Sequence, residues 1–326
     1  MKEEKKLMKL NLKNENQKLE NIQISGIQLY FFNFVHFLLQ TQSENYFMEY
    51  LLIIYQFIQL MAFPMDLVFS SGWKTSWFKT LAHFFHYFQL LFIFIDFNHF
   101  YIISFFTTFL YILIFIILLV ISMHRLEKYS TIPDIVLLSI YLLIQLNTIF
   151  HIPIFKILFN VFSCEKNNIL FNENIVCKGK IHIMMIVISC ILIIFYFPIL
   201  ILFKKIYFEF GVIRNKLKTA FTSSTEVLLV LVNFILVIVY QFIRNEIALS
   251  IITFILSLSL FIDYYGKQPF ANGNLNKTYL TLYLLFLWTT FICFIGLILK
   301  NSKFEGAIFL LLIGYPFIIL LIITKK

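Results

Sequence analysis

The chain has 326 residues, of which 60% are hydrophobic and only 13% are charged, and its mean hydropathy is +0.87. Soluble globular proteins have about 25% charged and about 45–50% apolar residues, so this composition excludes soluble enzymes, nucleic-acid-binding domains and small disulfide-rich proteins. The net charge of +9 matters here through its distribution over loops, because Lys and Arg in loops set the orientation of a membrane protein.

Residues 1–21 form a basic, polar tail that lacks the apolar stretch and small-residue cleavage site of a signal peptide. Over 22–326 we expect one multi-pass transmembrane domain, an all-α bundle of about ten spans of roughly 20 residues each. The first span contains several polar residues, so a helix lying in the membrane interface is the alternative there. Apolar stretches bounded by charged residues, Gly, Pro or Asn predict helices over 22–40, 46–69, 79–95, 99–123, 133–153, 181–203, 226–243, 246–265, 278–299 and 305–324.

The distribution of positive charge predicts the orientation. With ten spans and a cytosolic N-terminus, 19 of the 26 Lys and Arg residues fall on the cytosolic side and 7 on the other side. An excess of Lys and Arg marks cytosolic loops, so we expect both termini in the cytosol. The protein is then an integral component of the plasma membrane or of another membrane of the secretory route.

Two loops are long in this topology, an external loop over 154–180 and a cytosolic loop over 204–225. The external loop contains Cys164 and Cys177, and an oxidising compartment on that side favours a disulfide between them. Cys190 and Cys293 fall inside predicted helices, where we expect small buried side chains.

The cytosolic loop carries a cluster of basic residues that could contact anionic lipid headgroups, at about 1 kcal/mol for each residue near the surface. The alternative is that these residues serve only as the orientation signal. At the end of the loop Ser223 precedes Glu226 by three residues, the spacing of a capping box that marks a helix start. The basic residues are Lys204, Lys205, Arg214, Lys216 and Lys218.

Polar residues inside the predicted helices are candidates for function, because burying an ionisable group in a bilayer is costly. The deepest acidic residues are Asp66 and Asp263, and the amides at greater depth include Gln145 and Asn147. Such amides can also join helices through hydrogen bonds of about 1 kcal/mol each. A permeation path would require several of these groups to converge.

No sequence motif indicates catalysis: HExxH, GxSxG, the P-loop and GxGxxG are all absent. His83 and His86 share one helical face, but the seven histidines are scattered over both sides of the predicted membrane. We therefore expect no metal site, no cofactor and no enzymatic activity.

Three stretches of the chain resemble the multi-pass membrane region of ciliate PAS-domain (TmcB/TmcC-like) transmembrane proteins. They are 55–69 with the following Trp73 and Trp77, 158–164 with 176–183, and 264–277 with 303–321. The resemblance covers most of the chain from about residue 45 onward. It implies a membrane module that precedes cytosolic sensory or scaffolding domains. The sequence itself contains no PAS region, and no catalytic residues come from the resemblance.

We therefore expect a non-catalytic membrane module of a sensory, signalling or scaffolding system, with the lipid bilayer and unidentified proteins as partners. A transporter or channel for a small solute or ion is the alternative, with Asp66, Asp263 and the helix amides as its polar path. Convergence of these groups on one cavity would favour transport, and helix-end positions would weaken it. An intramembrane enzyme would require His83 and His86 to meet further ligands on the same side.

Overall fold

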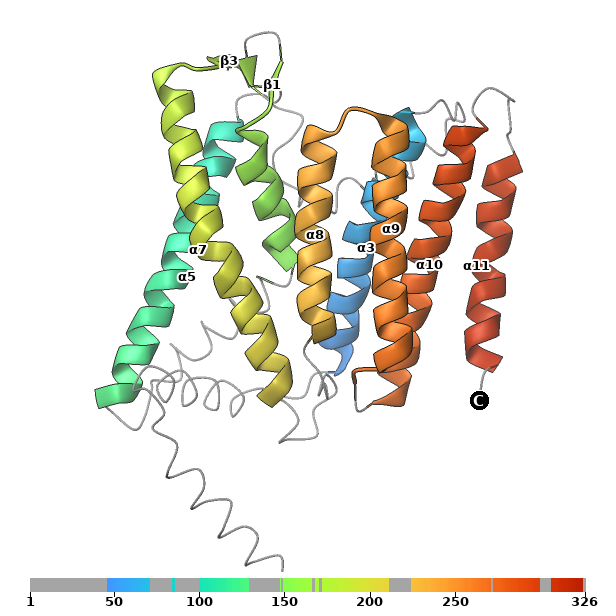
Figure 1. Ribbon diagram of the computed structural model, residues 1–326. Helices are drawn as coiled ribbons and strands as arrows, with labels where there is room; N and C mark the ends of the chain where they lie inside the picture. Colours follow the sequence, from blue (N-terminus) through green and yellow to red (C-terminus); the bar gives the residue numbers. More distant parts are fainter. Residues whose placement is uncertain are drawn as a thin grey trace, which may run out of the picture.

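The computed structural model describes residues 46–70, 84–85, 100–128, 147, 149–165, 168–169, 172–210, 224–270, 272–299 and 306–324. These residues form long helices and one small sheet (Figure 1). The helices are α3 (Tyr46–Ser70), α5 (Phe100–Lys128), α7 (Lys180–Phe210), α8 (Ser224–Phe242), α9 (Glu246–Lys267), α10 (Gly273–Ile298) and α11 (Gly306–Thr324). A further helix, Ile149–Asn160, is called the 149–160 helix below.

Among the described residues, four helices are long and apolar enough to cross a membrane: Lys180–Leu202, Ser224–Phe242, Glu246–Lys267 and Gly273–Ile298. A helical integral membrane protein is therefore confirmed. These residues support four spans and not the expected ten. The predicted helices at 22–40, most of 79–95 and most of 133–153 lie outside the described residues, as does the tail at 1–21.

Among the described residues the bundle is all-helical, as expected, and a small antiparallel sheet lies in the loop before α7. Its strands are β1 (Cys164–Glu165), β2 (Asn168–Ile169) and β3 (Asn172–Val176), in that order across the sheet. The sheet lies beyond the start of α7, at one end of the bundle (Figure 1). This end is called the sheet end below, and the other is called the far end.

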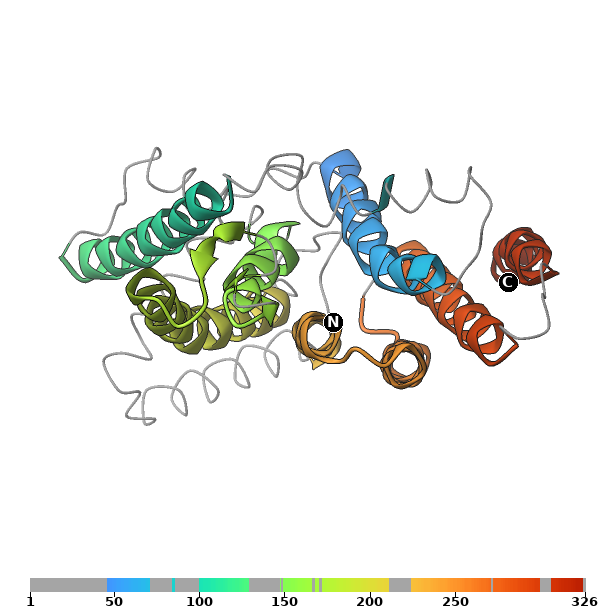
Figure 2. The same ribbon diagram turned by 90° about the horizontal axis from the view of Figure 1, so that it is seen from above.

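The helices form two groups with α8 between them. Seen from above, α5, the 149–160 helix and α7 lie on one side, whereas α3, α9, α10 and α11 lie on the other (Figure 2). Helix α8 contacts α7 in the first group and α9 and α3 in the second. The contact of the 149–160 helix and α7 with α3 and α8 is called the seam below.

Both predicted long loops are shorter than expected. The helix predicted to end at 153 continues to Asn160, because Phe155 and Leu158 are fully buried in the core. The external loop predicted over 154–180 is thereby reduced to 161–179. Helix α7 extends to Phe210 and α8 begins at Ser224, so the segment between these helices is 211–223, which lies outside the described residues.

The direction of α3 also differs from the ten-span topology. That topology makes 46–69 antiparallel to 226–243 and to 278–299. In the structure, the carbonyl of Phe63 accepts a hydrogen bond from Tyr240 near the end of α8. The carbonyl of Pro64 accepts one from Cys293 near the end of α10. Helix α3 therefore runs parallel to α8 and α10, a consequence of side-chain contacts that charge counting cannot detect.

Candidate functional site

Helix α8 carries three polar side chains at intervals of seven residues, Glu226, Asn233 and Tyr240. Seven residues are close to two helical turns and about 10 Å of rise, so the three side chains share one face. Glu226 and Asn233 are each only 1% exposed. Glu226 contacts α9 and α7, Asn233 contacts the 149–160 helix and Tyr240 contacts α3. A row of polar contacts therefore follows this face from the far end to the sheet end.

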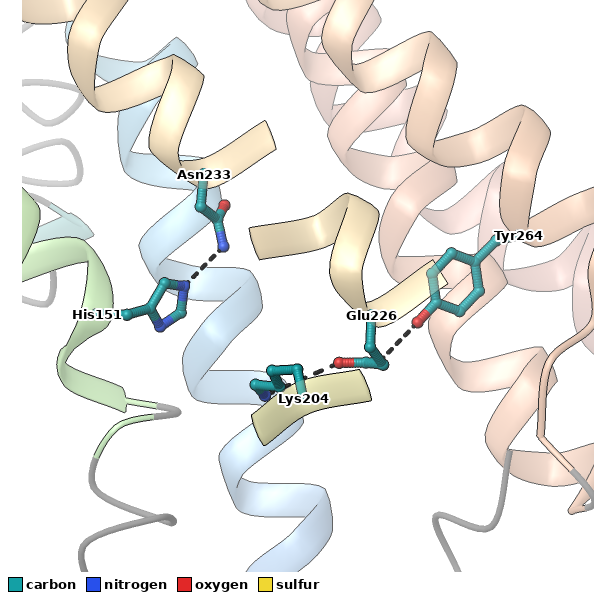
Figure 3. Close-up of polar contacts among 5 residues, drawn as sticks. All are labelled: His151, Lys204, Glu226, Asn233 and Tyr264. Carbon is teal, nitrogen blue, oxygen red and sulfur yellow. Dashed lines mark hydrogen bonds and ion pairs between the residues drawn. The ribbon is translucent and has the colours of Figure 1, made fainter. Parts of the chain in front are cut away.

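At the far end, Glu226 joins three helices (Figure 3). The hydroxyl of Tyr264 in α9 donates to Glu226 Oε1 over 2.9 Å. The ammonium nitrogen of Lys204 in α7 lies 3.9 Å from Glu226 Oε2. The second contact is an attraction between charges beyond direct hydrogen-bond distance, and it crosses the seam.

Glu226 has partners that the capping-box spacing did not predict. Helix α8 does begin near the predicted start, at Ser224. The carboxylate of Glu226 accepts a hydrogen bond from Tyr264 and lies beside Lys204. In a capping box this carboxylate would reach the backbone N–H of Ser223, which lies outside the described residues, so the capping box stays a prediction. Burial by α7 and α9 assigns the carboxylate to contacts between helices.

Aromatic rings of α9 and α10 cover one side of the contacts that Glu226 makes at the far end. The ring of Tyr264 lies 4.5 Å from that of Tyr283 and 5.3 Å from that of Tyr279, between ring centroids. Asn276 holds the turn between these helices, since its side chain accepts from the N–H of Phe270 and donates to the carbonyls of Gln268 and Phe270. The carboxylate of Glu226 is thereby shielded from water on the α9 and α10 side.

In the middle of the seam, Asn233 binds His151 of the 149–160 helix (Figure 3). The side-chain nitrogen of Asn233 lies 2.8 Å from His151 Nε2. Among the described residues, the Asn233 side-chain oxygen has no hydrogen-bond partner. A second contact nearby crosses the seam, because Gln59 of α3 donates to the carbonyl of Ile149 over 2.9 Å.

Contacts at the sheet end complete the seam. Gln241 of α8 donates to the hydroxyl of Ser163, which follows the 149–160 helix. The ammonium of Lys156 lies 5.3 Å from the centroid of the Phe63 ring of α3, a cation–π contact. Lys156 was expected in the external loop and instead lies within the 149–160 helix.

Apolar packing accompanies the polar contacts along the seam. The ring of Phe234 in α8 stacks on that of Phe197 in α7, with centroids 4.1 Å apart and planes at 18°. The same ring meets Phe155 edge-on at 4.9 Å. Such aromatic pairs contribute about 0.5–1.5 kcal/mol beyond the area that they bury.

The sheet is attached firmly to the first group of helices through His182 near the start of α7. The His182 side chain is 3% exposed. Its Nδ1 accepts a hydrogen bond from the N–H of Lys178, and its Nε2 lies 2.7 Å from the carbonyl of Val161. The turn after β3 is thus tied to the end of the 149–160 helix. No pattern in the sequence indicates a role for this histidine.

A disulfide bond lies next to His182, in the loop before α7. Cys177 is disulfide-bonded, whereas Cys190 and Cys293 are free thiols. Cys164, where β1 begins, is the predicted partner of Cys177, and this pairing stays a prediction. Of the two helical cysteines, Cys293 is buried as expected and Cys190 is exposed.

The structure does not bring the acidic candidates together. Asp263 forms an ion pair with Lys267 one turn further along α9, at the far end. Asp66 lies in α3, two residues beyond Pro64 and therefore toward the sheet end. The two acidic residues thus lie toward opposite ends of the bundle, which weakens the polar path expected of a transporter.

The two amide candidates have different outcomes. Asn147 is 4% exposed and accepts a hydrogen bond from Tyr196 of α7 over 2.8 Å, so it joins helices within the first group. Gln145 lies outside the described residues.

The basic candidates divide into three kinds. Lys204 is buried beside Glu226, a correction to its expected place at the headgroups. The physical reason is the length of α7, which places this lysine inside the helix and within reach of α8. Lys205 is exposed and stays a candidate for lipid contact. Arg214, Lys216 and Lys218 lie outside the described residues.

In the described part of the chain, no three His, Cys, Asp or Glu side chains are grouped so that they could hold a metal ion. His83 and His86 lie outside it. No protein-family model matches the chain, and no curated protein or solved structure shows a significant match. The resemblance to the ciliate PAS-domain membrane region therefore stays a prediction.

Proposed function

We propose that the chain is a non-catalytic, multi-pass membrane module of a sensory or signalling system. In this module the sheet, the 149–160 helix and α7 move as one unit against α3 and α8. The observation that carries the proposal is the seam, where buried ionisable and amide side chains join the two groups of helices. Polar side chains at such a contact can exchange one hydrogen-bonding partner for another. Purely apolar packing between membrane helices is specified by the shapes of the side chains alone.

The moving unit is supported by its attachments. His182 binds backbone groups on both sides of the sheet, and Cys177 closes a disulfide beside it. A displacement of the sheet would therefore be transmitted directly to α7. The other end of α7 carries Lys204, so a tilt of the unit alters the distance from Lys204 to Glu226.

The proposed orientation places the sheet outside the cell and the far end at the cytosol. Both termini are then cytosolic, and the protein lies in the plasma membrane or another membrane of the secretory route. A cysteine introduced near Asn168 should then react with an impermeant thiol reagent from outside, whereas one near Asn215 should not. The reverse labelling would invert the orientation and with it the direction of the proposed signal.

The test of movement is a distance across the far end of the seam. Leu202 of α7 and Ile262 of α9 are 45% and 60% exposed, so spin labels at these positions leave the core intact. With Cys190 and Cys293 replaced by Ser, pulsed electron resonance of the full chain in neutral bilayers gives the distribution of label distances. Glu226→Gln removes the charge that faces Lys204 and should shift or broaden this distribution.

The matched control is Tyr264→Phe, which removes a hydrogen bond to the same carboxylate without touching the seam. It should leave the distribution unchanged. A narrow distribution that is identical in the parent and in Glu226→Gln would show a static seam and would refute the proposed movement.

Transport of a small ion is the second candidate, and one observation favours it. Glu226 is a buried ionisable group in a candidate membrane span, and such groups mark ion pathways in many transporters. Reconstituted vesicles loaded with a pH-sensitive dye test this candidate. Proton leakage that requires Glu226 and is lost in Glu226→Gln would support transport, and equal leakage in both would exclude proton movement through this residue.

A further inference from the structure

His182 is held by two backbone groups that fix which of its ring nitrogens carries a proton. The N–H of Lys178 can only donate, so Nδ1 of the ring is the acceptor and carries no proton. The carbonyl of Val161 can only accept, so Nε2 carries the proton and donates over 2.7 Å. The ring is therefore neutral, in a single tautomer. Residues 177–179, which join β3 to α7, are called the β3–α7 turn below, and the turn is closed while Lys178 binds His182.

A second proton on the His182 ring removes the acceptor that closes the β3–α7 turn. The imidazolium donates at both nitrogens, so no rotation of the ring offers an acceptor to the N–H of Lys178. The contact with the carbonyl of Val161 survives, because it already uses the ring as a donor. The ring thus stays attached to the end of the 149–160 helix, while the turn loses its partner.

The surroundings of His182 disfavour a positive charge on the ring. The side chain is 3% exposed, and in the described part of the chain it forms no ion pair. Burial of a charge without a partner is costly. The ring also lies in the first turn of α7, where the helix dipole opposes a cation. The closed turn therefore holds the neutral ring, and acidification favours the open turn.

The other charged groups near the β3–α7 turn were compared with this expectation. Lys178 and Lys180 are exposed close to His182 along the chain, so a further positive charge there meets repulsion. Helix α5 carries its charged residues in its last turns, at 124–128, and Glu226 of α8 lies at the far end. The sheet and the 149–160 helix contribute Glu165 in β1, Glu173 in β3 and Lys156.

The backbone of the β3–α7 turn favours opening once the hydrogen bond is lost. Lys178 has a φ of 68°, in the left-handed region, which is disfavoured for a residue with a Cβ. The hydrogen bond from its N–H to His182 stabilises this conformation. Without that bond, Lys178 is free to relax to a negative φ.

From these contacts we infer that protonation of His182 opens the β3–α7 turn, so that the proton is a ligand of this site. The neutral ring joins the sheet to the start of α7, and the charged ring releases it. Acidification at the sheet end thus uncouples the sheet from α7. The inference goes beyond the proposed function, because it rests on the contacts of one side chain and not on movement at the seam.

Hydrogen exchange of the turn tests the inference in the full chain, in neutral bilayers, because it reports local opening. Exchange is followed by mass spectrometry on peptides that contain 177–183, between about pH 5 and about pH 8, the range in which histidine ordinarily titrates. The rates are corrected for the intrinsic pH dependence of amide exchange. Since one proton is taken up on opening, the protection of the turn should fall on acidification by up to about tenfold for each pH unit.

His182→Gln is the variant that separates titration from simple loss of a side chain. The Gln amide offers an acceptor to Lys178 and a donor to Val161, but it does not titrate. Protection of 177–183 in this variant should therefore not change with pH.

The turn between α9 and α10 is the matched control within the same molecule. Among the described residues, Gln268 is the other non-Gly residue with a positive φ, at 41°. Asn276 holds this turn through hydrogen bonds from its side chain to the carbonyls of Gln268 and Phe270. Because an amide does not titrate, protection of 268–276 should be independent of pH in both proteins.

The outcomes decide the inference. Protection of 177–183 that falls on acidification in the parent alone would support it. The inference is overturned if the parent and His182→Gln share the same pH dependence, or if protection in the parent does not change. Should His182→Gln fail to fold, protection of 268–276 is lost as well, and nitrogen NMR of the parent with labelled histidine decides. A His182 ring that stays neutral down to about pH 5 would then overturn the inference. The label distances across the seam test the proposed movement separately.

Discussion

Replacement of Gly314 by Ala tests how closely α11 packs on α10. A Cβ at this position would lie 2.9 Å from Trp288 Cζ2 and closer still to Trp288 Nε1 and Cε2, well inside contact distance. The indole is held in place because its N–H donates to the carbonyl of Leu310 over 3.3 Å. The added methyl group therefore has to displace either the indole ring or the whole of α11.

The expected loss of stability combines two terms. Overpacking costs about 1–3 kcal/mol, and losing the indole hydrogen bond costs about 0.5–1.5 kcal/mol. Gly314→Ala should thus lower the free energy of unfolding by about 1.5–4.5 kcal/mol. The assay is unfolding by sodium dodecyl sulfate in mixed micelles, followed by circular dichroism.

Two variants check the steric reason. Gly266→Ala in α9 places its Cβ in open space, so it should be neutral or stabilise by about 0.5–1 kcal/mol. Trp288→Phe removes the ring nitrogen that faces Gly314. The double variant, Trp288→Phe with Gly314→Ala, should therefore lose less stability than the sum of the losses in the two single variants. The argument would be refuted if the Gly314→Ala protein were as stable as the parent, or if it lost no more stability than the Gly266→Ala protein.

Four more predictions concern individual side chains. Asn276 starts an N-x-T sequence, but its side chain is engaged in the turn before α10, so endoglycosidase should not alter the gel mobility of the protein. Asn276→Ala should cost about 2–3 kcal/mol of unfolding free energy through lost hydrogen bonds, against a parent measured in the same micelles. In detergent, maleimide should modify Cys190 at once and Cys177 only after reduction; modification of Cys177 without reductant would contradict the disulfide. His182→Ala should lower the free energy of unfolding by about 1–3 kcal/mol, and an unchanged unfolding midpoint would show that the sheet is not anchored by this side chain.

Sequence patterns located α7 to α11 well. Every backbone group in a bilayer needs a partner within its own segment, so a long apolar stretch has few alternatives to a helix. The predicted helix at 246–265 corresponds to Glu246–Lys267, and 278–299 to Gly273–Ile298. Asn272 explains the early start of α10, because its side chain accepts from the N–H of Asn274 and of Leu275.

The candidate site was harder to predict, because its residues come from helices far apart in the chain. Glu226 was interpreted as a cap and Lys204 as a surface residue, since each interpretation used only neighbouring residues. One signal was present in the sequence. The seven-residue spacing of Glu226, Asn233 and Tyr240 places three polar side chains on one face of an otherwise apolar helix, and a face of this kind needs protein partners in a membrane.

The sequence by itself determined the membrane class, the positions of the apolar helices and the oxidisable cysteines of the loop before α7. These properties follow from composition and local pattern, because the bilayer acts on each segment separately. Only the tertiary structure decided that α3 runs parallel to α8, that His151 meets Asn233, and that Lys204 turns inward to Glu226. Those contacts depend on which faces of distant helices meet, and residue spacing along one helix carries no information about the helix opposite.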